Sequence, residues 1–167
     1  RSTTLDLSDP TDLTVFLSLL DDCDVLIESF DPGRTHVLGI DQVTLRERNP
    51  QLIYASITGF GHTGPRSAEP AVDTTLQGLS GLMSVTGLPD SPPVKIGVPI
   101  TDLNAGMYAV YGIFCAYINR LKTGVGQLVD TSLLEGGIAY TFWESTIFFA
   151  TGENPEPAGS AHRLSAP

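Results

Sequence analysis

The fold of this chain is decided by the stretch Asp24-Val25-Leu26-Ile27-Glu28-Ser29, which the turn Asp31-Pro32-Gly33 follows. A short apolar run bounded by turn residues is typical of a buried strand. A second such run, 52–57, comes after a segment, 41–48, that we expect to be a helix ending before Pro50. Strand, helix and strand joined by short connections predict a parallel βαβ unit, so the first third of the chain is α/β.

Helices are expected around these strands. Asp9-Pro10 has the composition of a helix start, and the buried stripe of that helix is predicted to be Leu13, Phe16, Leu17 and Leu20. Further along the chain, the apolar spacing predicts helices at 73–83, 102–122 and 133–151, a short strand at 127–131, and a tail at 152–167 without a core of its own. The helix at 102–122 is apolar nearly all round, so we expect it to be central.

Composition limits the classes of function. The 167 residues suffice for one ordinary domain with a core, and 41% hydrophobic with 17% charged residues is typical of a globular protein. A net charge of −10 with nine Lys and Arg argues against nucleic acid as a partner. The most apolar stretch, 138–151, is too short to span a bilayer and contains Glu144, so we expect no membrane partner.

The cysteines and the opening residues indicate a cytoplasmic protein. Cys23 and Cys115 belong to no C-x-x-C pattern, and we expect two buried, reduced thiols. The opening residues 1–7 lack the apolar core of a signal peptide.

Asp102 is the candidate catalytic residue. It follows Pro99 at the beginning of a helical apolar pattern, so we expect it at or next to an N-cap, where backbone N–H groups and the helix dipole favour the ionised carboxylate. Such a carboxylate beside apolar walls can attack an activated acyl group. The alternative is a purely structural cap, because Asp is a preferred N-cap residue.

A glycine-dense loop, Gly59-Phe60-Gly61-His62-Thr63-Gly64-Pro65, directly follows the second predicted strand. Ligands bind at the carboxyl ends of strands in open α/β sheets, so this loop is a candidate binding segment. A plain connection is the alternative. The loop lacks the Gly-Lys-Ser/Thr signature of a phosphate loop.

Taken together, the segments resemble the class III CoA-transferases, the CaiB/BaiF family of formyl-CoA transferase and α-methylacyl-CoA racemase. The resemblance implies the large domain of that fold: a partial Rossmann-like open parallel sheet with flanking helices, over residues 1–151, followed by a linker at 152–167. The runs that carry the resemblance cover almost the whole chain in order: 1–7, 24–33, 49–61, 80–83, 87–90 and 123–127, with Asp130 and Ser132.

The resemblance implies a covalent mechanism on Asp102. The family's nucleophile is an Asp in a run like Gly97-Val98-Pro99-Ile100-Thr101-Asp102. It forms a mixed anhydride with the acyl group and then an aspartyl-CoA thioester, from which an acceptor carboxylate collects the CoA. The substrates would be an acyl-CoA and a carboxylic acid, with no permanently bound cofactor and no metal.

Other site residues are also implied by the resemblance. Ser29 stands where the family usually has Asn, and Ser8 and Val37 replace cations that some members place near the CoA phosphates; Arg34 is a candidate to compensate. The implied pocket residues are Gly59, Phe60, Gly61 and Gln77. The implied CoA-binding residues are Leu5, Asp6, Leu7, Ser8, Ser29, Phe30, Asp31, Arg34, Glu69, Pro70, Ala71, Val72 and Asp73.

Two alternatives remain open from the sequence. The racemase branch of the family has a His where this chain has Val72, so the loss of that base favours the transferase reading over an acyl-CoA racemase or isomerase. Family members are more than twice as long and form interlocked homodimers. We therefore expect this chain to be inactive alone, and a catalytically silent fragment is the second alternative.

Overall fold

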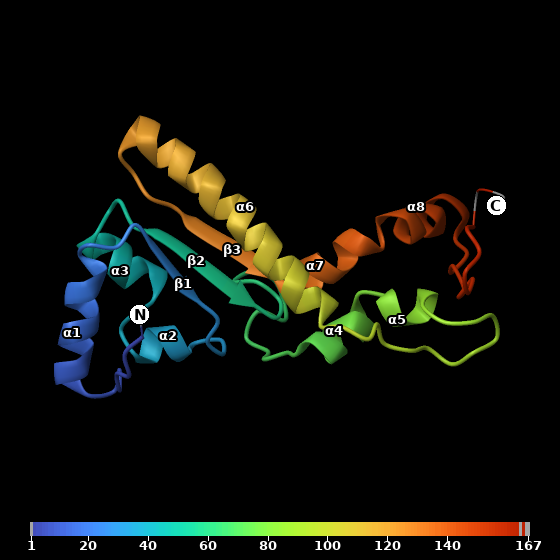
Figure 1. Ribbon diagram of the computed structural model, residues 1–167, viewed down its shortest axis with the longest axis horizontal. Helices are drawn as coiled ribbons and strands as arrows, with labels where there is room; N and C mark the ends of the chain where they lie inside the picture. Colours follow the sequence, from blue (N-terminus) through green and yellow to red (C-terminus); the bar gives the residue numbers. More distant parts are fainter. Residues whose placement is uncertain (1, 164, 166–167) are drawn as a thin grey trace. The chain divides into compact units, whose positions relative to one another are not determined.

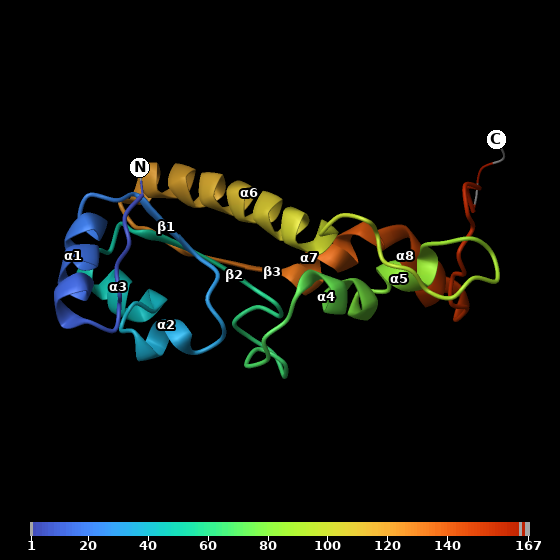
Figure 2. The same cartoon turned by 60° about the horizontal axis from the view of Figure 1, so that its bottom comes forward.

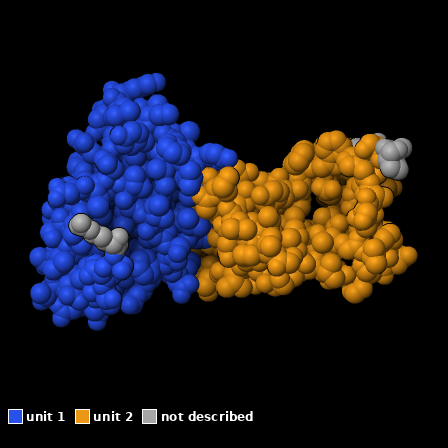
Figure 3. Space-filling model, in the orientation of Figure 1, with its two compact units in different colours: residues 1–58, 109–130 blue, residues 59–108, 131–167 orange. Residues whose placement is uncertain are grey.

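The computed structural model describes residues 2–163 and 165, which divide into two compact units (Figure 3). Unit 1 comprises residues 1–58 and 109–130, and unit 2 comprises residues 59–108 and 131–167. Figure 1 labels the elements, which are α1 (Pro10–Leu20), β1 (Val25–Glu28), α2 (Arg34–Val37), α3 (Gln42–Arg48), β2 (Ile53–Thr58), α4 (Asp73–Leu79), α5 (Leu82–Val85), α6 (Ile100–Thr123), β3 (Leu128–Ser132), α7 (Leu133–Tyr140) and α8 (Phe142–Thr151).

The three strands form an open parallel sheet in the order β1-β2-β3. In the β1–β2 pair, Val25 lies opposite Ile53 and Glu28 opposite Ser56. This pairing confirms the predicted βαβ unit and its α/β class. The crossover contains α3, as predicted, and also α2, a single turn after Gly33 that the sequence did not reveal.

Neighbouring residues of β2 face opposite sides of the sheet, because side chains alternate along a strand. Tyr54 is buried on one side with residues of α1, α3 and the α2–α3 connection, and its hydroxyl donates to the Ile40 carbonyl at 3.1 Å. Ile53 packs on the other side with Ala116 of α6 and Val129 of β3. The sheet of unit 1 is therefore covered by α1–α3 on one face and by the C-terminal half of α6 on the other (Figure 2).

Helix α6 packs through small residues. A Cβ on Gly112 would lie 2.5 Å from Val129 Cγ1, and Ala109 and Ala116 are buried. Its large apolar side chains lie elsewhere, with Phe114 62% and Leu121 69% exposed. The expectation of a central helix is thus wrong for this chain, because only the small-residue side is covered. Among the described residues, neither α6 nor another helix has the length and apolarity to cross a membrane.

Two predicted helices are each divided in the structure. The segment 73–83 breaks after α4, where Gly81 adopts a φ of 85°, a conformation that favours glycine. The segment 133–151 breaks at Thr141, whose hydroxyl donates to the Ile138 carbonyl at 3.0 Å. Local side-chain bonds of this kind compete with helix continuation.

The expectation of buried thiols is also wrong for this chain. Cys23 and Cys115 are both free and exposed. Cys23 follows the end of α1, and Cys115 lies on the part of α6 where the neighbouring Phe114 is also exposed.

Gly126 is a site where the fold demands glycine. A Cβ there would lie 2.5 Å from the Gln51 carbonyl oxygen and would also strike the Leu52 carbonyl. We predict that Gly126→Ala lowers the free energy of unfolding by about 3 kcal/mol, because backbone cannot move aside as a side chain does. The matched control is Gly106→Ala in α6, where the Cβ meets open space, and which should stabilise by up to about 1 kcal/mol. Equal melting temperatures of the two variants would contradict this packing.

Candidate active site

Asp102 lies in the first turn of α6, in unit 2, as that helix's third residue. The helix begins at Ile100, two residues earlier than predicted, and the Leu103 N–H donates to the Pro99 carbonyl at 3.0 Å. Asp102 is exposed, and its carboxyl accepts no hydrogen bond from the residues that the structure describes. The expectation that Asp102 lies at or next to the N-cap is therefore wrong, and its side chain is available for a ligand.

The carboxylate that caps α6 belongs to Asp73, the first residue of α4. Asp73 Oδ1 accepts hydrogen bonds from the Thr101 N–H at 2.9 Å and from the Thr101 hydroxyl at 2.8 Å. One of the unsatisfied N–H groups of the first helical turn is thus paired by a side chain from another helix. The family resemblance implies a CoA-binding role for Asp73, but the sequence gives no indication of this bond.

Gln77 joins this cap from within α4, one turn after Asp73. Its Nε2 donates to Asp73 Oδ2 at 2.8 Å and to the Val98 carbonyl at 3.2 Å, and its Oε1 accepts from the Ile96 N–H at 2.8 Å. Gln77 and Thr101 are both fully buried. The predicted pocket residue Gln77 is therefore a buried link between α4 and the segment that leads into α6.

Helix α7 approaches the first turn of α6 through two adjacent glycines. A Cβ on Gly136 would lie 3.1 Å from the Thr101 carbonyl oxygen, and one on Gly137 would lie 2.7 Å from the Ser80 Cβ. Asn104 Nδ2 donates to the Gly136 carbonyl at 2.6 Å. Sequence reasoning missed these residues, although a glycine pair inside a helical pattern is itself a sign of close packing.

The electrostatics of Asp102 differ from the expectation. Partial burial of the carboxyl raises the pKa of Asp102, and the negative charge of nearby Asp73 raises this pKa further. The predicted bias toward the ionised form is wrong, since the cap that meets the helix N-terminus is Asp73. A carboxylate with a raised pKa is a stronger base when ionised, and intrinsic nucleophilicity rises with basicity.

The glycine-dense loop lies in the same unit. A Cβ on Gly59 would lie 2.7 Å from the Ala71 Cβ, so two predicted site residues meet there.

The Arg66 guanidinium lies 4.2 Å from the centre of the Phe60 ring and donates to Glu69 at 2.7 Å. This bond lowers the pKa of Glu69. Sequence reasoning missed Arg66. Of the remaining predicted residues of this group, Gly61 is buried, whereas Pro70 and Val72 are exposed.

The other predicted CoA-binding residues lie in unit 1. Leu7, Ser29 and Phe30 line a cavity of about 420 Å³ between α1 and β1, together with buried Glu28. Glu28 Oε2 accepts from the Phe30 N–H at 2.9 Å, which fixes the chain direction after β1. The cavity walls are mostly apolar side chains, with the Glu28 carboxylate as their charged group.

Asp6 and Ser8 form a local turn before α1. The Ser8 hydroxyl and N–H donate to Asp6 Oδ1 at 2.6 and 2.9 Å, which lowers the pKa of Asp6. Leu5 is half-buried, and Asp31 and Arg34 are exposed, with the Arg34 N–H donating to the Asp31 carbonyl at 3.0 Å.

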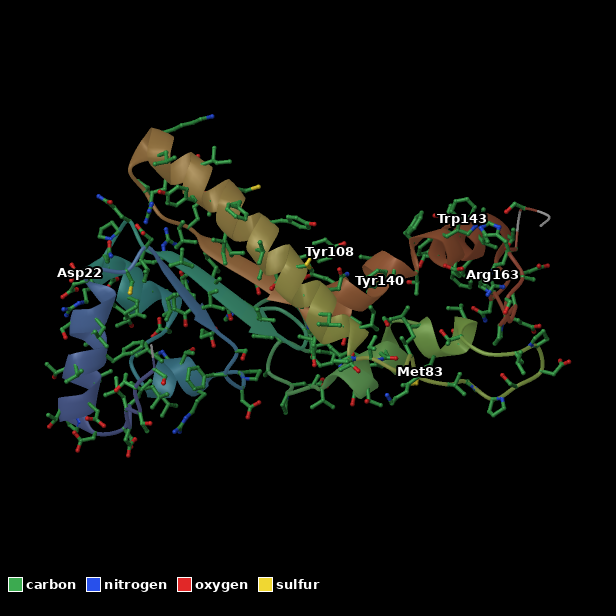
Figure 4. The ribbon with its side chains drawn as sticks, viewed as in Figure 1. Asp22, Met83, Tyr108, Tyr140, Trp143 and Arg163 are labelled. Atoms are coloured by element: carbon green, nitrogen blue, oxygen red, sulfur yellow. The ribbon has the colours of Figure 1, made fainter. Side chains whose placement is uncertain are left out.

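Another cavity, of about 340 Å³, is lined by α8 and tail residues of unit 2, including Trp143 and Arg163, which Figure 4 labels. Arg163 pairs with Glu144 at 3.4 Å. None of the predicted site residues lines it. Among the described residues, no group of three or more His, Cys, Asp and Glu side chains has a metal-binding arrangement.

The fold and the site define an α/β protein with an exposed carboxylate in the first turn of a long helix. Over residues 1–167 the sequence matches CoA-transferase family III, so the chain belongs to this family.

Named relatives and a solved structure agree with this membership. The chain is 40% identical to acetyl-CoA:oxalate CoA-transferase of Acetobacter aceti, with all of this chain and 43% of that protein aligned. It is 39% identical to succinate–glutarate CoA-transferase of Agrobacterium fabrum, over 97% of this chain and 40% of that protein. A crystal structure of a CaiB/BaiF family protein from Brucella suis superposes with a TM-score of 0.94 at 40% identity, over all of this chain and 44% of that one. The chain thus spans well under half the length of these relatives.

The effect of Asp73 on Asp102 is testable by titration. We predict that Asp73→Asn lowers the pKa of Asp102, because it removes one negative charge while its amide oxygen can still accept from the Thr101 N–H. The carboxyl carbon shift of Asp102 in NMR spectra reports this value. Thr101→Val is the control, since it leaves the Asp73 charge in place and should change the pKa little. An unchanged Asp102 pKa in Asp73→Asn would contradict the electrostatic coupling.

Proposed function

We propose that the protein containing this chain transfers coenzyme A between carboxylic acids, with Asp102 as the nucleophile. The observation that carries the proposal is the exposed Asp102 carboxyl, placed beside the Asp73 cap in a chain of CoA-transferase family III. The named relatives support the reaction class, since each is a CoA-transferase named for acid or acyl-CoA substrates.

The proposed reaction begins with attack of an Asp102 carboxylate oxygen on the thioester carbonyl of an acyl-CoA. The C–S bond breaks, CoA leaves as a thiolate, and an acyl-aspartyl anhydride forms. The thiolate then attacks the aspartyl carbonyl of the anhydride, which releases the donor carboxylate and leaves an aspartyl-CoA thioester. No proton needs to be transferred in these steps, so no Ser–His pair is required.

The acceptor reverses this sequence. Its carboxylate attacks the aspartyl-CoA carbonyl, which expels the CoA thiolate and forms a second anhydride. The thiolate attacks the acceptor's acyl carbon, giving the new acyl-CoA and restoring the Asp102 carboxylate. The raised pKa of Asp102 supports this role, because a more basic carboxylate is the better nucleophile.

The implied site residues fall into two groups, one in each compact unit, and each group is assigned by itself. We assign Leu5–Ser8, Ser29–Asp31 and Arg34 to CoA binding, supported by the cavity that Leu7, Ser29 and Phe30 line. In unit 2 we assign residues 69–73 to CoA binding, and the 59–61 loop with Gln77 to the pocket, supported by the close approach of Gly59 and Ala71. The same proposal assigns residues 1–151 to a large domain and residues 152–167 to a linker. It also includes a homodimer and a cytoplasmic location.

Val72 argues against the racemase alternative. It stands directly before Asp73, where the resemblance implies a His in racemases, and its side chain is 65% exposed without an ionisable group. A two-base proton transfer therefore has no base at this position.

Replacement of Asp102 tests the proposed function. In the full-length protein, we predict that Asp102→Asn lowers kcat for CoA transfer by roughly 10⁴-fold, because the amide cannot form the anhydride. Trapping with hydroxylamine during turnover, followed by mass spectrometry, should modify Asp102 in the parent enzyme. Asp22→Asn is the control: Asp22 is an exposed Asp of unit 1, labelled in Figure 4, and its replacement should leave kcat unchanged.

Two outcomes would overturn the proposal. One is an Asp102→Asn enzyme of undiminished rate, or a trapped adduct found solely on another carboxylate. The other comes from the same incubation in deuterated water: rapid deuteration of the acyl-CoA α-carbon without CoA exchange would identify a racemase instead.

A further inference from the structure

The buried Gln77 side chain acts as a clamp, by which we mean that its three hydrogen bonds hold neighbouring segments together. It is fully buried, and its amide nitrogen uses both N–H groups, one toward Asp73 Oδ2 at 2.8 Å and one toward the Val98 carbonyl at 3.2 Å. Its amide oxygen accepts from the Ile96 N–H at 2.8 Å. No purely apolar side chain can provide these three bonds, and their loss would leave buried polar groups unpaired.

These bonds act on two neighbouring parts of unit 2. The bonds to Ile96 and Val98 attach the segment before α6 to α4. The bond to Asp73 fixes one oxygen of the carboxylate whose other oxygen caps Thr101 at the first turn of α6. With both oxygens held, the Asp73 carboxylate cannot rotate away from the helix end.

We propose that Gln77 is a positioning residue for the nucleophile: it holds Asp73 and the 96–98 segment together and thereby fixes the turn that carries Asp102. This inference rests on the proposed function of Asp102. Gln77 acts through Asp73 and the backbone rather than on the substrate. A misplacement of about 1 Å in a reacting group can cost roughly 10²-fold in rate, so a clamp one helix away can matter for catalysis.

The chemistry of the clamp requires an amide rather than an acid. A carboxylate at position 77 would set a negative oxygen against Asp73 Oδ2 and the Val98 carbonyl, the two acceptors that Nε2 now serves. Burial and the Asp73 charge would raise the pKa of the introduced carboxyl. Once protonated, that group has one O–H donor and can restore one of the two bonds, while its other oxygen still accepts from the Ile96 N–H.

The test compares Gln77→Leu and Gln77→Glu in the full-length enzyme, with kcat and KM measured across pH and the Asp102 adduct trapped in parallel. We expect Gln77→Leu to lose roughly 10²-fold in kcat at every pH, with KM for the acyl-CoA little changed. We expect Gln77→Glu to be similarly impaired at high pH and to recover relative to the parent enzyme as pH falls. A role in fold stability alone would not produce this pH dependence in correctly folded enzyme.

Gln51→Leu is the matched control, because Gln51 is an exposed residue of unit 1 and its loss should leave kcat and its pH profile unchanged. If Gln77→Leu does not fold, two other measurements test the positioning role of Gln77. They are the pH profile of Gln77→Glu and the kcat of Thr101→Val, a variant that loses one hydrogen bond to Asp73. Parent-like kcat in the folded Gln77 variants, beside an inactive Asp102→Asn, would overturn the clamp and leave the proposed function standing. A fully active Asp102→Asn would overturn both.

Discussion

The hydrogen bonds between Asp73 and Thr101 are the interaction on which the candidate site depends. They tie the first residue of α4 to the first turn of α6, and they provide the carboxylate that a helix N-terminus attracts. Because Asp73 meets this need, Asp102 is left exposed one residue further along the helix. Partial burial of the Asp102 carboxyl raises its pKa, and the Asp73 charge that caps the helix raises this pKa further. The capping contact thus helps to place the proposed nucleophile, and the charge of the capping carboxylate adds to the basicity that burial gives Asp102.

The packing around this contact leaves little freedom. Gly136 and Gly137 bring α7 against Thr101 and Ser80 at distances that exclude a Cβ, and Asn104 donates across the same interface. Rigid elements hold reacting groups more accurately than loops do. The buried Gln77 adds three hydrogen bonds that an apolar side chain at this position could not make.

Much of the fold could be predicted from the sequence, because local patterns determine it. The strand runs, the helix start at Asp9-Pro10 and the βαβ order are set by residues close in the chain, and the structure has them. The helix breaks at Gly81 and Thr141 were missed, since apolar spacing continues through both. The start of α6 was misplaced because its cap comes from Asp73, which is distant in sequence and therefore invisible to a capping pattern. Asp102 could be proposed as the nucleophile from its place at a helix start and from the family resemblance, whereas its neighbours Thr101, Asn104 and Gly137 required three-dimensional contacts.

The role of Asp102 as the nucleophile is tested most directly by a crystal structure of the full-length protein frozen during turnover with an acyl-CoA. We predict continuous electron density from the Asp102 carboxyl to an acyl carbon or from its carbonyl carbon to the CoA sulfur, with the Asp73 carboxylate still bonded to the Thr101 N–H. Continuous density to any other side chain, with Asp102 unmodified and free of substrate, would contradict it.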